Sequence, residues 1–369
     1  MKIGILTFYC SNNYGAMLQA YALKTFVKSI CNDTQIVPYA PFFLVGRHWF
    51  IPYCPLKPFS AMLRYTLSGL KNNLLTTGID AFRQKRRMHD FRRKYLCDNF
   101  HVIRSTKGLE SLPFDTYIVG SDQIWNPEIT MGLRPAYFGA FPGKNKKQVI
   151  AYAASLGGEK IALKYQDEMR TLLTNVDQIS LREASAIPFI QNLTGRTATA
   201  VADPVFLLEK NQWETMVSPP TENHYILVHV TEKNNKLEDY ASQLSTEKHL
   251  PVIQLKYRKD RKRDNKNFQI VTDAGPLEFL GYVCHADYVL TNSFHVLAFS
   301  IIFQKNFLVF GHSSRNARLE NLLTYCTLNE RMVQSGQEKI DKPISWNMIA
   351  QRINQMKKES SSFLLHSLN

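Results

Sequence analysis

The chain has 369 residues, of which 44% are hydrophobic and 21% charged, a composition typical of a globular protein with room for two domains. No apolar run is long enough to span a bilayer, and the first apolar stretch is too short for a signal-peptide core, so we expect a cytoplasmic protein. The formal net charge of +14 indicates an anionic partner, which can be nucleic acid, an acidic membrane surface or an acidic small substrate.

The first predicted unit is a strand at residues 3–8, a polar loop at 12–15 and a helix at 16–27 with apolar side chains at helical spacing. It resembles the start of a nucleotide-binding domain but lacks the G-x-G-x-x-G pattern, so a dinucleotide is disfavoured. Asn12 and Asn13 in the loop are either turn formers or ligand-binding residues.

Residues 34–79 contain no acidic side chain and are rich in aromatic and basic ones, including Trp49 and Phe50. Two interpretations stay open. One is a lid or insertion that touches an anionic membrane, and the other is an ordinary excursion packed on the core.

Two basic runs account for much of the positive charge. The first predicts a helix over residues 81–96 with Phe82, Phe91 and Leu96 facing inward, and the second occupies residues 256–266. For either run alone, a solvated surface is the simpler interpretation.

Three further strands, at residues 115–119, 148–154 and 178–181, each end in polar residues. Strands separated by helical stretches predict a parallel sheet, in which these endings share one edge. Arg182 directly follows the third of these strands and is a candidate anion clamp, because its planar guanidinium matches a carboxylate or phosphate. We therefore expect the following residues to converge: Asn12, Asn13, Ser121, Asp122, Trp125, Ser155 and Arg182.

A proline-rich piece at residues 218–223 is the best candidate linker, and a second alternation of strands and helices follows it. Strands are predicted at 225–230, 251–255 and 268–271, with a helix at 237–245 and another at 276–284.

The most informative stretch is residues 288–303. A short buried strand at 288–290 stops at Thr291, Asn292 and Ser293, which can cap a helix by accepting backbone N–H bonds. The free N–H groups and positive dipole end of such a helix favour an anion. His295 falls in its first turn, where it can meet a bound anion, although a core histidine bonded to backbone is the alternative.

These patterns predict an α/β protein with two Rossmann-like domains that face each other across a cleft. The first domain covers residues 1–200 with an insertion at 40–100, and the second covers 201–335. Residues 336–369 form a helical tail, which could pack back on the first domain.

An ordered set of motifs resembles the polysaccharide pyruvyl transferase family. The matching segments run in family order from Met1 to about Arg331, and Val296 departs from the glycine that many members have after the histidine. They are the opening strand with Asn12-Asn13-Tyr14-Gly15-Ala16 and Leu18-Gln19-Ala20-Tyr21-Ala22-Leu23, Gly120-Ser121-Asp122-Gln123-Ile124-Trp125-Asn126-Pro127, Tyr152-Ala153-Ala154-Ser155-Leu156-Gly157, Ser180-Leu181-Arg182-Glu183, Ala202-Asp203-Pro204, Thr291-Asn292-Ser293-Phe294-His295 and Arg315-Asn316-Ala317-Arg318.

The resemblance implies a fold similar to two-domain glycosyltransferases of the GT-B type, with the acceptor on the first domain and the donor on the second. It implies a transferase of exopolysaccharide or capsule biosynthesis that moves a pyruvyl group from phosphoenolpyruvate to two hydroxyls of one sugar, in a glycan or a lipid-linked precursor, and forms a cyclic ketal.

His295 and Arg182 fall on the donor-site positions of the family, and Asp122 is a candidate base or sugar-hydroxyl acceptor. No cofactor is expected beyond phosphoenolpyruvate as co-substrate. No metal is expected either, because the six cysteines are scattered without ligand spacing and predict reduced thiols. The expected substrate-binding residues are Asn12, Asn13, Tyr14, Ser121, Trp125, Ser155, Asn292, Ser293, Arg315 and Arg318.

Two other functions stay open. A nucleotide-sugar glycosyltransferase of surface polysaccharide biosynthesis would share the architecture, but the usual acidic ribose-binding residue is not evident near Arg315 and Arg318. A nucleic-acid-binding protein would use the basic runs, but no recognised module is present, so nucleic acid is not an expected partner. A peripheral position on the inner face of a membrane is compatible with the main prediction, since glycan precursors are commonly built on lipid carriers.

Overall fold

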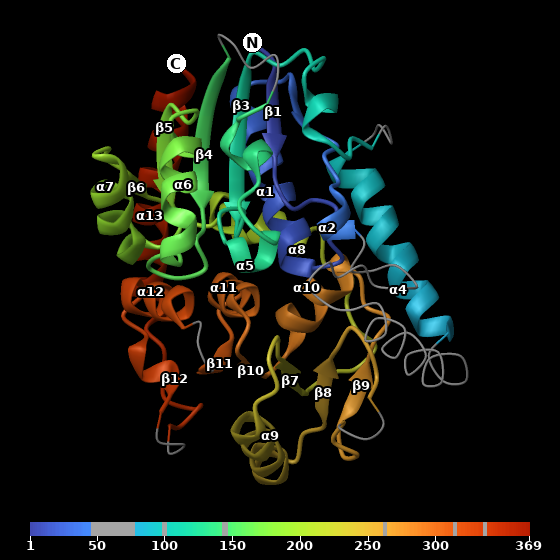
Figure 1. Cartoon of the computed structure of the whole chain (residues 1–369). Coiled ribbons are helices and arrows are strands. Elements are labelled where there is room, and N and C mark those ends of the chain that lie inside the picture. The colour runs from blue at the N-terminus through green and yellow to red at the C-terminus, as the bar shows by residue number, and fades with distance from the viewer. Residues whose placement is uncertain (46–77, 98–101, 142–146, 261–263, 313–315, 335–337) are drawn as a thin grey trace. The chain divides into compact units, whose positions relative to one another are not determined.

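The computed structural model describes residues 1–45, 78–97, 102–141, 147–260, 264–312, 316–334 and 338–369 (Figure 1). Contacts between residues divide the chain into two compact units. The first unit takes residues 1–69, 92–207 and 355–369, and the second takes residues 70–91 and 208–354. Each unit has its own parallel sheet with helices packed on it, so the predicted α/β class is confirmed.

The first unit is built on a six-stranded sheet in which all neighbouring strands are parallel. Its order is β2-β1-β3-β4-β5-β6, with β1 (Ile3–Leu6), β2 (Thr34–Ile36), β3 (Thr116–Asp122), β4 (Gln148–Ala154), β5 (Gln178–Leu181) and β6 (Thr199–Ala200). The chain runs from β1 outward to β2 and then returns to β3 on the other side of β1. The carboxyl ends of β1 and β3 therefore form a topological switch point, where open α/β sheets bind ligands.

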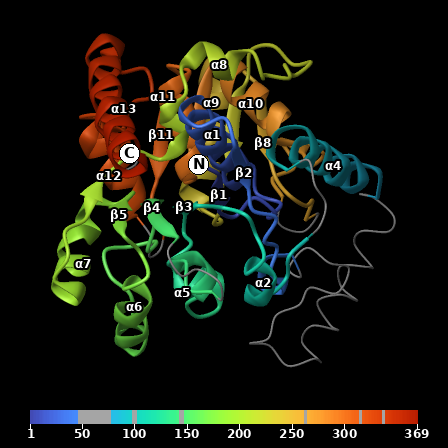
Figure 2. The same cartoon turned by 90° about the horizontal axis from the view of Figure 1, so that it is seen from above.

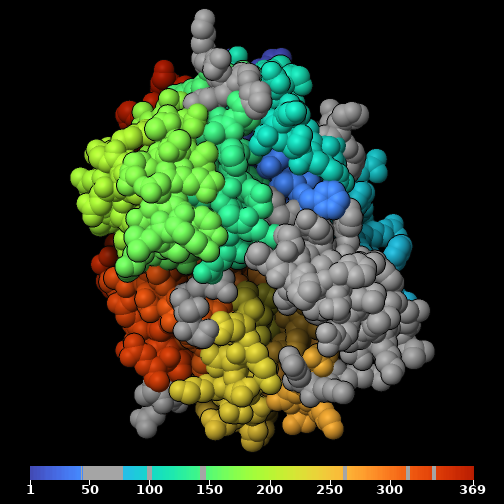
Figure 3. All heavy atoms as spheres, in the orientation of Figure 1, coloured from blue at the N-terminus to red at the C-terminus, as the bar shows by residue number. Residues whose placement is uncertain are grey.

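The first unit also contains several helices and helical turns. They are α1 (Tyr14–Ile30), α2 (Phe42–Val45), α5 (Pro127–Thr130), α6 (Gln166–Leu173) and α7 (Ile187–Thr194), with 3-10 turns at Thr106–Leu109, Pro135–Phe138, Leu163–Tyr165, Ala184–Ala186 and Pro204–Leu207 and a π-helical turn at Arg92–Leu96. The side chain of Asn13 caps α1 by accepting a hydrogen bond from Ala16 N at 2.9 Å. Helix α1 packs on β2 and β3 (Figure 2), and α6 packs against α7 on a face that is yellow-green in Figure 3.

The second unit repeats the design with another fully parallel sheet, in the order β12-β11-β10-β7-β8-β9. The strands are β7 (Ile226–His229), β8 (Val252–Leu255), β9 (Gln269–Val271), β10 (Tyr288–Thr291), β11 (Asn306–Phe310) and β12 (Met332–Val333). The chain leaves β7 toward β8 and β9 and returns to β10 on the other side of β7. The switch point of this unit is therefore at the carboxyl ends of β7 and β10.

The helices of the second unit are α4 (Gly78–Phe91), α8 (Lys210–Glu214), α9 (Asn235–Lys248), α10 (Pro276–His285), α11 (Phe294–Ile302) and α12 (Ala317–Tyr325), with a 3-10 turn at Asn329–Arg331. Helix α11 is buried along nearly its whole length, as its continuous apolar sequence predicts.

The C-terminal helix α13 (Trp346–Leu368) lies within the predicted helical tail. Its residues from Gln355 onward belong to the first unit. There Gln148 Nε2 donates to the carbonyl oxygen of Ser367, and the backbone N–H of Ala202 donates to Ser360 Oγ, both at 2.8 Å. These bonds attach the tail to β4 and to the segment after β6.

One detail of the first basic run is wrong in the sequence-based prediction. Phe91 and Leu96 are buried as expected, but the side chain of Phe82 is 68% exposed. The reason is that Gln84, Met88 and Phe91 form the buried face of α4, and Phe82 lies on the opposite side of the helix.

Most of the acid-free segment, including Trp49 and Phe50, lies outside the described residues, as do residues 261–263 of the second basic run. In the part of the chain that the structure describes, no helix is both long enough and apolar enough to cross a membrane. The described cysteines, Cys10, Cys31, Cys97, Cys284 and Cys326, are all free thiols.

Candidate active site

The switch point of the first unit is organised by a buried glutamine, Gln19 of α1. Its Nε2 donates to Thr7 Oγ1 at 2.9 Å, and its Oε1 accepts a hydrogen bond from Ser121 Oγ at 3.1 Å. One side chain thus joins the loop after β1 to the end of β3. Sequence reasoning missed Gln19 as a site residue, although its place in the first helix after a strand with a polar end was a usable signal.

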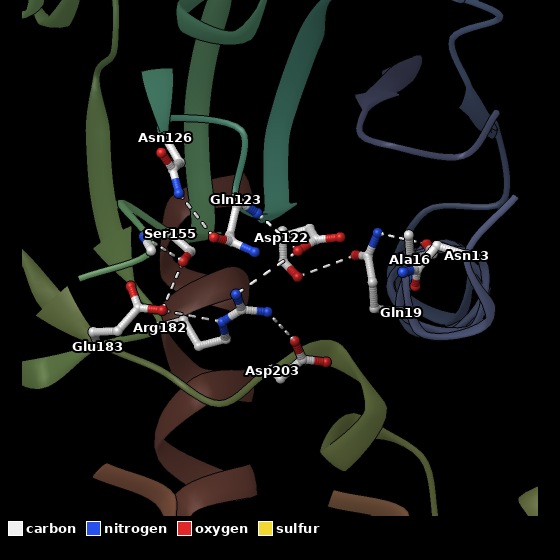
Figure 4. A network of polar contacts seen from close by, with 12 residues as sticks. Asn13, Ala16, Gln19, Asp122, Gln123, Asn126, Ser155, Arg182, Glu183 and Asp203 are labelled. Carbon is white, nitrogen blue, oxygen red and sulfur yellow. Dashed lines mark hydrogen bonds and ion pairs between the residues drawn. The ribbon is translucent and has the colours of Figure 1, made fainter. Parts of the chain in front are cut away.

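Arg182 lies at the centre of the polar network at this edge (Figure 4). Its Nη1 donates to Asp203 Oδ2 at 2.8 Å, its Nε contacts Glu183 Oε1 at 3.3 Å, and its Nη2 lies 3.8 Å from Asp122 Oδ1. Burial by itself would lower the pKa of Arg182, but the three carboxylates raise it above the ordinary value. The guanidinium therefore stays charged inside the protein, and it is held by acidic residues of its own unit.

Asp122 occupies a strained position at the end of β3, with φ at 68°. Its Oδ1 accepts a hydrogen bond from the backbone N–H of Gln123 at 2.8 Å, and its side chain is 12% exposed. The preceding Gly120 has φ at 125°, and a Cβ there would lie 2.0 Å from the carbonyl oxygen of Tyr152. Only glycine fits this close approach of β3 to β4, which fixes where Asp122 emerges.

Ser155 connects the end of β4 to the same network. Its Oγ donates to Glu183 Oε1 at 2.6 Å and accepts a hydrogen bond from the backbone N–H of Gly157 at 3.1 Å. The expected convergence thus appears for Asp122, Ser155 and Arg182, which the ends of three adjacent strands bring into one network. Ser121, next to Asp122 in β3, bonds to Gln19 instead.

The other predicted residues of this unit have different surroundings. Asn12 accepts a hydrogen bond from Arg92 Nη1 at 2.9 Å, and Asn13 is the cap of α1. The rings of Tyr14 and Trp125 are buried, and Trp125 donates from Nε1 to the carbonyl oxygen of Tyr137 at 2.9 Å. In this structure both rings pack in the core.

At the switch point of the second unit, β10 leads into α11 through Thr291, Asn292 and Ser293. Ser293 is the N-cap but makes no side-chain cap bond, contrary to the predicted role of these residues. Instead, Thr291 Oγ1 accepts a hydrogen bond from Ser293 N at 2.9 Å, and Asn292 Oδ1 accepts one from Thr231 N at 2.8 Å. The three residues therefore join the loop after β7 to the start of α11.

His295 lies in the first turn of α11 and is buried, and its ring meets the edge of Phe294 at a centroid distance of 5.3 Å. The guanidinium of Arg318, at the start of α12, lies 6.0 Å from the centre of the Phe294 ring. The start of α11 thus has a histidine within it and an arginine nearby. Arg315 lies outside the described residues.

A second histidine, His312, follows β11 at the same sheet edge. Its Nδ1 lies 3.2 Å from Glu232 Oε2, its Nε2 lies 3.4 Å from Thr231 Oγ1, and its backbone N–H donates to Asn316 Oδ1. This histidine–carboxylate pair was not predicted from the sequence, although polar residues at the end of β11 follow the same rule as those at the other strand ends.

His229, at the end of β7, is fully enclosed. Burial lowers its pKa from the ordinary value to about 4, so the imidazole is neutral at physiological pH. Its Nδ1 lies 3.0 Å from the carbonyl oxygen of Leu255 and donates to it. Over the described ranges, no group of three or more His, Cys, Asp or Glu residues is placed to hold a metal ion.

The two parallel sheets, each with polar groups at its switch point, define a protein of the GT-B-like α/β class. Solved structures of this fold class are similar over nearly the whole chain. A UDP-GlcNAc 2-epimerase from Neisseria meningitidis bound to UDP-GlcNAc matches with a TM-score of 0.50 and 11% identity, covering 100% of this chain and 99% of its own. Another UDP-N-acetylglucosamine 2-epimerase matches with a TM-score of 0.51 and 11% identity, covering 97% and 95%.

The family itself is shown by sequence. The family model described as polysaccharide pyruvyl transferase matches residues 13–314, so the chain belongs to this family of transferases. A search among curated protein sequences found no match. At 11% identity, the structural similarity shows the fold alone.

Proposed function

We propose that this protein transfers a pyruvyl group from phosphoenolpyruvate to two hydroxyls of one sugar in a surface glycan or its lipid-linked precursor. Membership of the family supports the reaction class. The observation that carries the proposal is the start of α11, where the buried His295 follows an N-cap residue that makes no side-chain cap bond, and where Arg318 lies 6.0 Å from the Phe294 ring. This combination suits a small anion with a carboxylate and a phosphate.

The chemistry sets the roles that the residues would take. In the reaction, C3 of phosphoenolpyruvate gains a proton and becomes a methyl group, C2 forms bonds to both sugar oxygens, and phosphate leaves. The two sugar hydroxyls release two protons. One accounts for the proton that C3 gains, and the other leaves with the phosphate. We assign His295 as the acid or phosphate partner and Asp122 as the base or acceptor of a sugar hydroxyl. The donor is assigned to the second unit and the sugar to the first.

Arg182 is assigned to the donor anion by the resemblance alone. Its three carboxylate neighbours imply that an anion would have to replace one of them to bind it directly. In its present contacts, Arg182 instead holds Asp122 and Glu183 at the end of the strands. The proposed role of Arg182 is therefore to orient Asp122 through their ion pair, until an anionic ligand takes the place of Asp122.

The test is mass spectrometry of a panel of glycan acceptors incubated with phosphoenolpyruvate and the protein. We expect one acceptor to gain the mass of one pyruvate ketal, with release of phosphate. His295→Ala should lower the rate at least about 100-fold, in the range for loss of a general acid. His285→Ala is the matched control, since His285 ends α10 before β10 begins, at the opposite edge of the sheet.

Two results would overturn the proposal. One is near wild-type transfer by His295→Ala. The other is saturable binding of UDP or GDP without binding of phosphoenolpyruvate, which would favour a nucleotide-sugar glycosyltransferase of the same fold.

A further inference from the structure

One face of helix α4 is attached to the rest of the second unit by hydrogen bonds and ion pairs. Gln84 Nε2 donates to the carbonyl oxygen of Thr272 at 2.8 Å, and Arg87 pairs with Asp273 at 3.0 Å and with Glu278 at 3.2 Å. Met88 and Phe91 are buried on the same side. These contacts fix the rotation of the helix, and therefore they also fix which side chains point outward.

The outward face combines large apolar side chains with arginines. Ile79 and Phe82 are 70% and 68% exposed, and Arg83 and Arg86 are exposed beside them. Their spacing of three, four and seven residues from Ile79 places all four on one face of the helix. Such exposure of two neighbouring large apolar groups costs free energy in water, so it needs an explanation that a solvated face does not give.

The charge of this face is positive on balance. Lys85 is also exposed, and the one acidic group on this side, Asp90, lies 3.7 Å from Arg86 and 3.6 Å from His89. Asp80, near the start of the helix, pairs with Lys259 at 3.3 Å and does not belong to this face. The face therefore attracts anions while it also offers apolar side chains.

We infer that this face of α4, formed by Ile79, Phe82, Arg83, Lys85 and Arg86, docks on an anionic lipid surface. Helices at a membrane interface place aromatic and aliphatic side chains below the headgroups and basic side chains among the lipid phosphates. A polyanion such as nucleic acid would satisfy the arginines but would leave Ile79 and Phe82 exposed. A lipid surface satisfies both kinds of side chain and would bring the enzyme to lipid-linked acceptors.

The experiment is flotation of the full chain with vesicles of phosphatidylcholine alone or with phosphatidylglycerol added, at physiological salt. Wild type should bind the anionic vesicles and bind the neutral ones weakly. Ile79→Ser with Phe82→Ser, and separately Arg83→Glu with Arg86→Glu, should each weaken binding about tenfold or more.

Matched controls distinguish the effect of this face from a general effect of exposed apolar side chains or of net charge. Leu163→Ser removes a side chain that is 83% exposed in the first unit, and Lys107→Glu with Lys160→Glu changes the net charge as much as the arginine pair does. Both controls should bind like wild type.

The inference is overturned if wild type does not bind anionic vesicles, or if the controls weaken binding as much as the variants of the face. It is also overturned if the arginine pair matters and the apolar pair does not, because the binding is then electrostatic attraction alone and the helix face does not dock on the lipid. No donor or acceptor is present in the assay, so its outcome is independent of the proposed reaction.

Discussion

Replacing Arg182 by methionine tests whether the first unit depends on a buried cation among carboxylates. The change keeps much of the side-chain volume and removes the charge, and Asp122, Glu183 and Asp203 lose their shared partner. At separations of 2.8 to 3.8 Å and an effective dielectric constant of about 20, each pair attracts by roughly 4 to 6 kcal/mol before desolvation is counted. Because desolvation offsets most of this attraction, we expect a net loss of about 3 to 5 kcal/mol in the free energy of unfolding.

Urea denaturation followed by circular dichroism measures this loss. Arg86→Met is the matched control, because Arg86 pairs with Asp90 at the surface, where the two side chains are 74% and 60% exposed. The control should cost no more than about 1 kcal/mol. A double-mutant cycle with Asp203→Asn should recover part of the loss, since it removes one of the uncompensated charges.

A result within about 1 kcal/mol of wild type for Arg182→Met would refute this reasoning. It would mean that the three carboxylates do not need the cation, and therefore that Arg182 is free to serve mainly as a ligand clamp.

Three further predictions concern stability. Gly120→Ala should destabilise the protein by about 3 kcal/mol or more in thermal unfolding, because its Cβ would meet the backbone of Tyr152, whereas Gly158→Ala, with no heavy atom within 4 Å of its Cβ, should stay within about 0.5 kcal/mol. The pKa of His229 is about 4 in the folded state and has its ordinary, higher value in the unfolded state. Protonation therefore favours the unfolded state, and the free energy of unfolding should fall by about 3 kcal/mol as the pH drops from the ordinary pKa of histidine to about 4. His229→Asn should flatten this part of the curve of stability against pH. Asn292→Ala should lower the free energy of unfolding by about 1 to 3 kcal/mol in thermal unfolding, because it leaves Thr231 N and the carbonyl oxygen of Glu232 without their present partner. Equal destabilisation by both glycine variants, an unchanged pH curve for His229→Asn, or no loss for Asn292→Ala would contradict the corresponding account.

The sequence determined the class of fold and the sheet edges at which the polar strand ends gather. Apolar strands of four to seven residues alternate along the chain with segments of helical periodicity, a pattern that predicts parallel sheets. Parallel strands place all their carboxyl ends at one edge of the sheet. For this reason the sequence alone places Ser121, Asp122, Ser155 and Arg182 at one edge of the sheet. The helix that begins at Phe294 could be located for the same reason.

Only the tertiary structure decided what those side chains contact. The partners of Arg182 come from three separate places in the chain, and nothing local to Arg182 indicates that Asp203 lies 2.8 Å from it. The orientation of α4 was likewise set by Thr272, Asp273 and Glu278, so the pattern of its own residues placed Phe82 on the wrong side. Local spacing fixes periodicity, but burial and ion pairing depend on which distant segments the fold brings together.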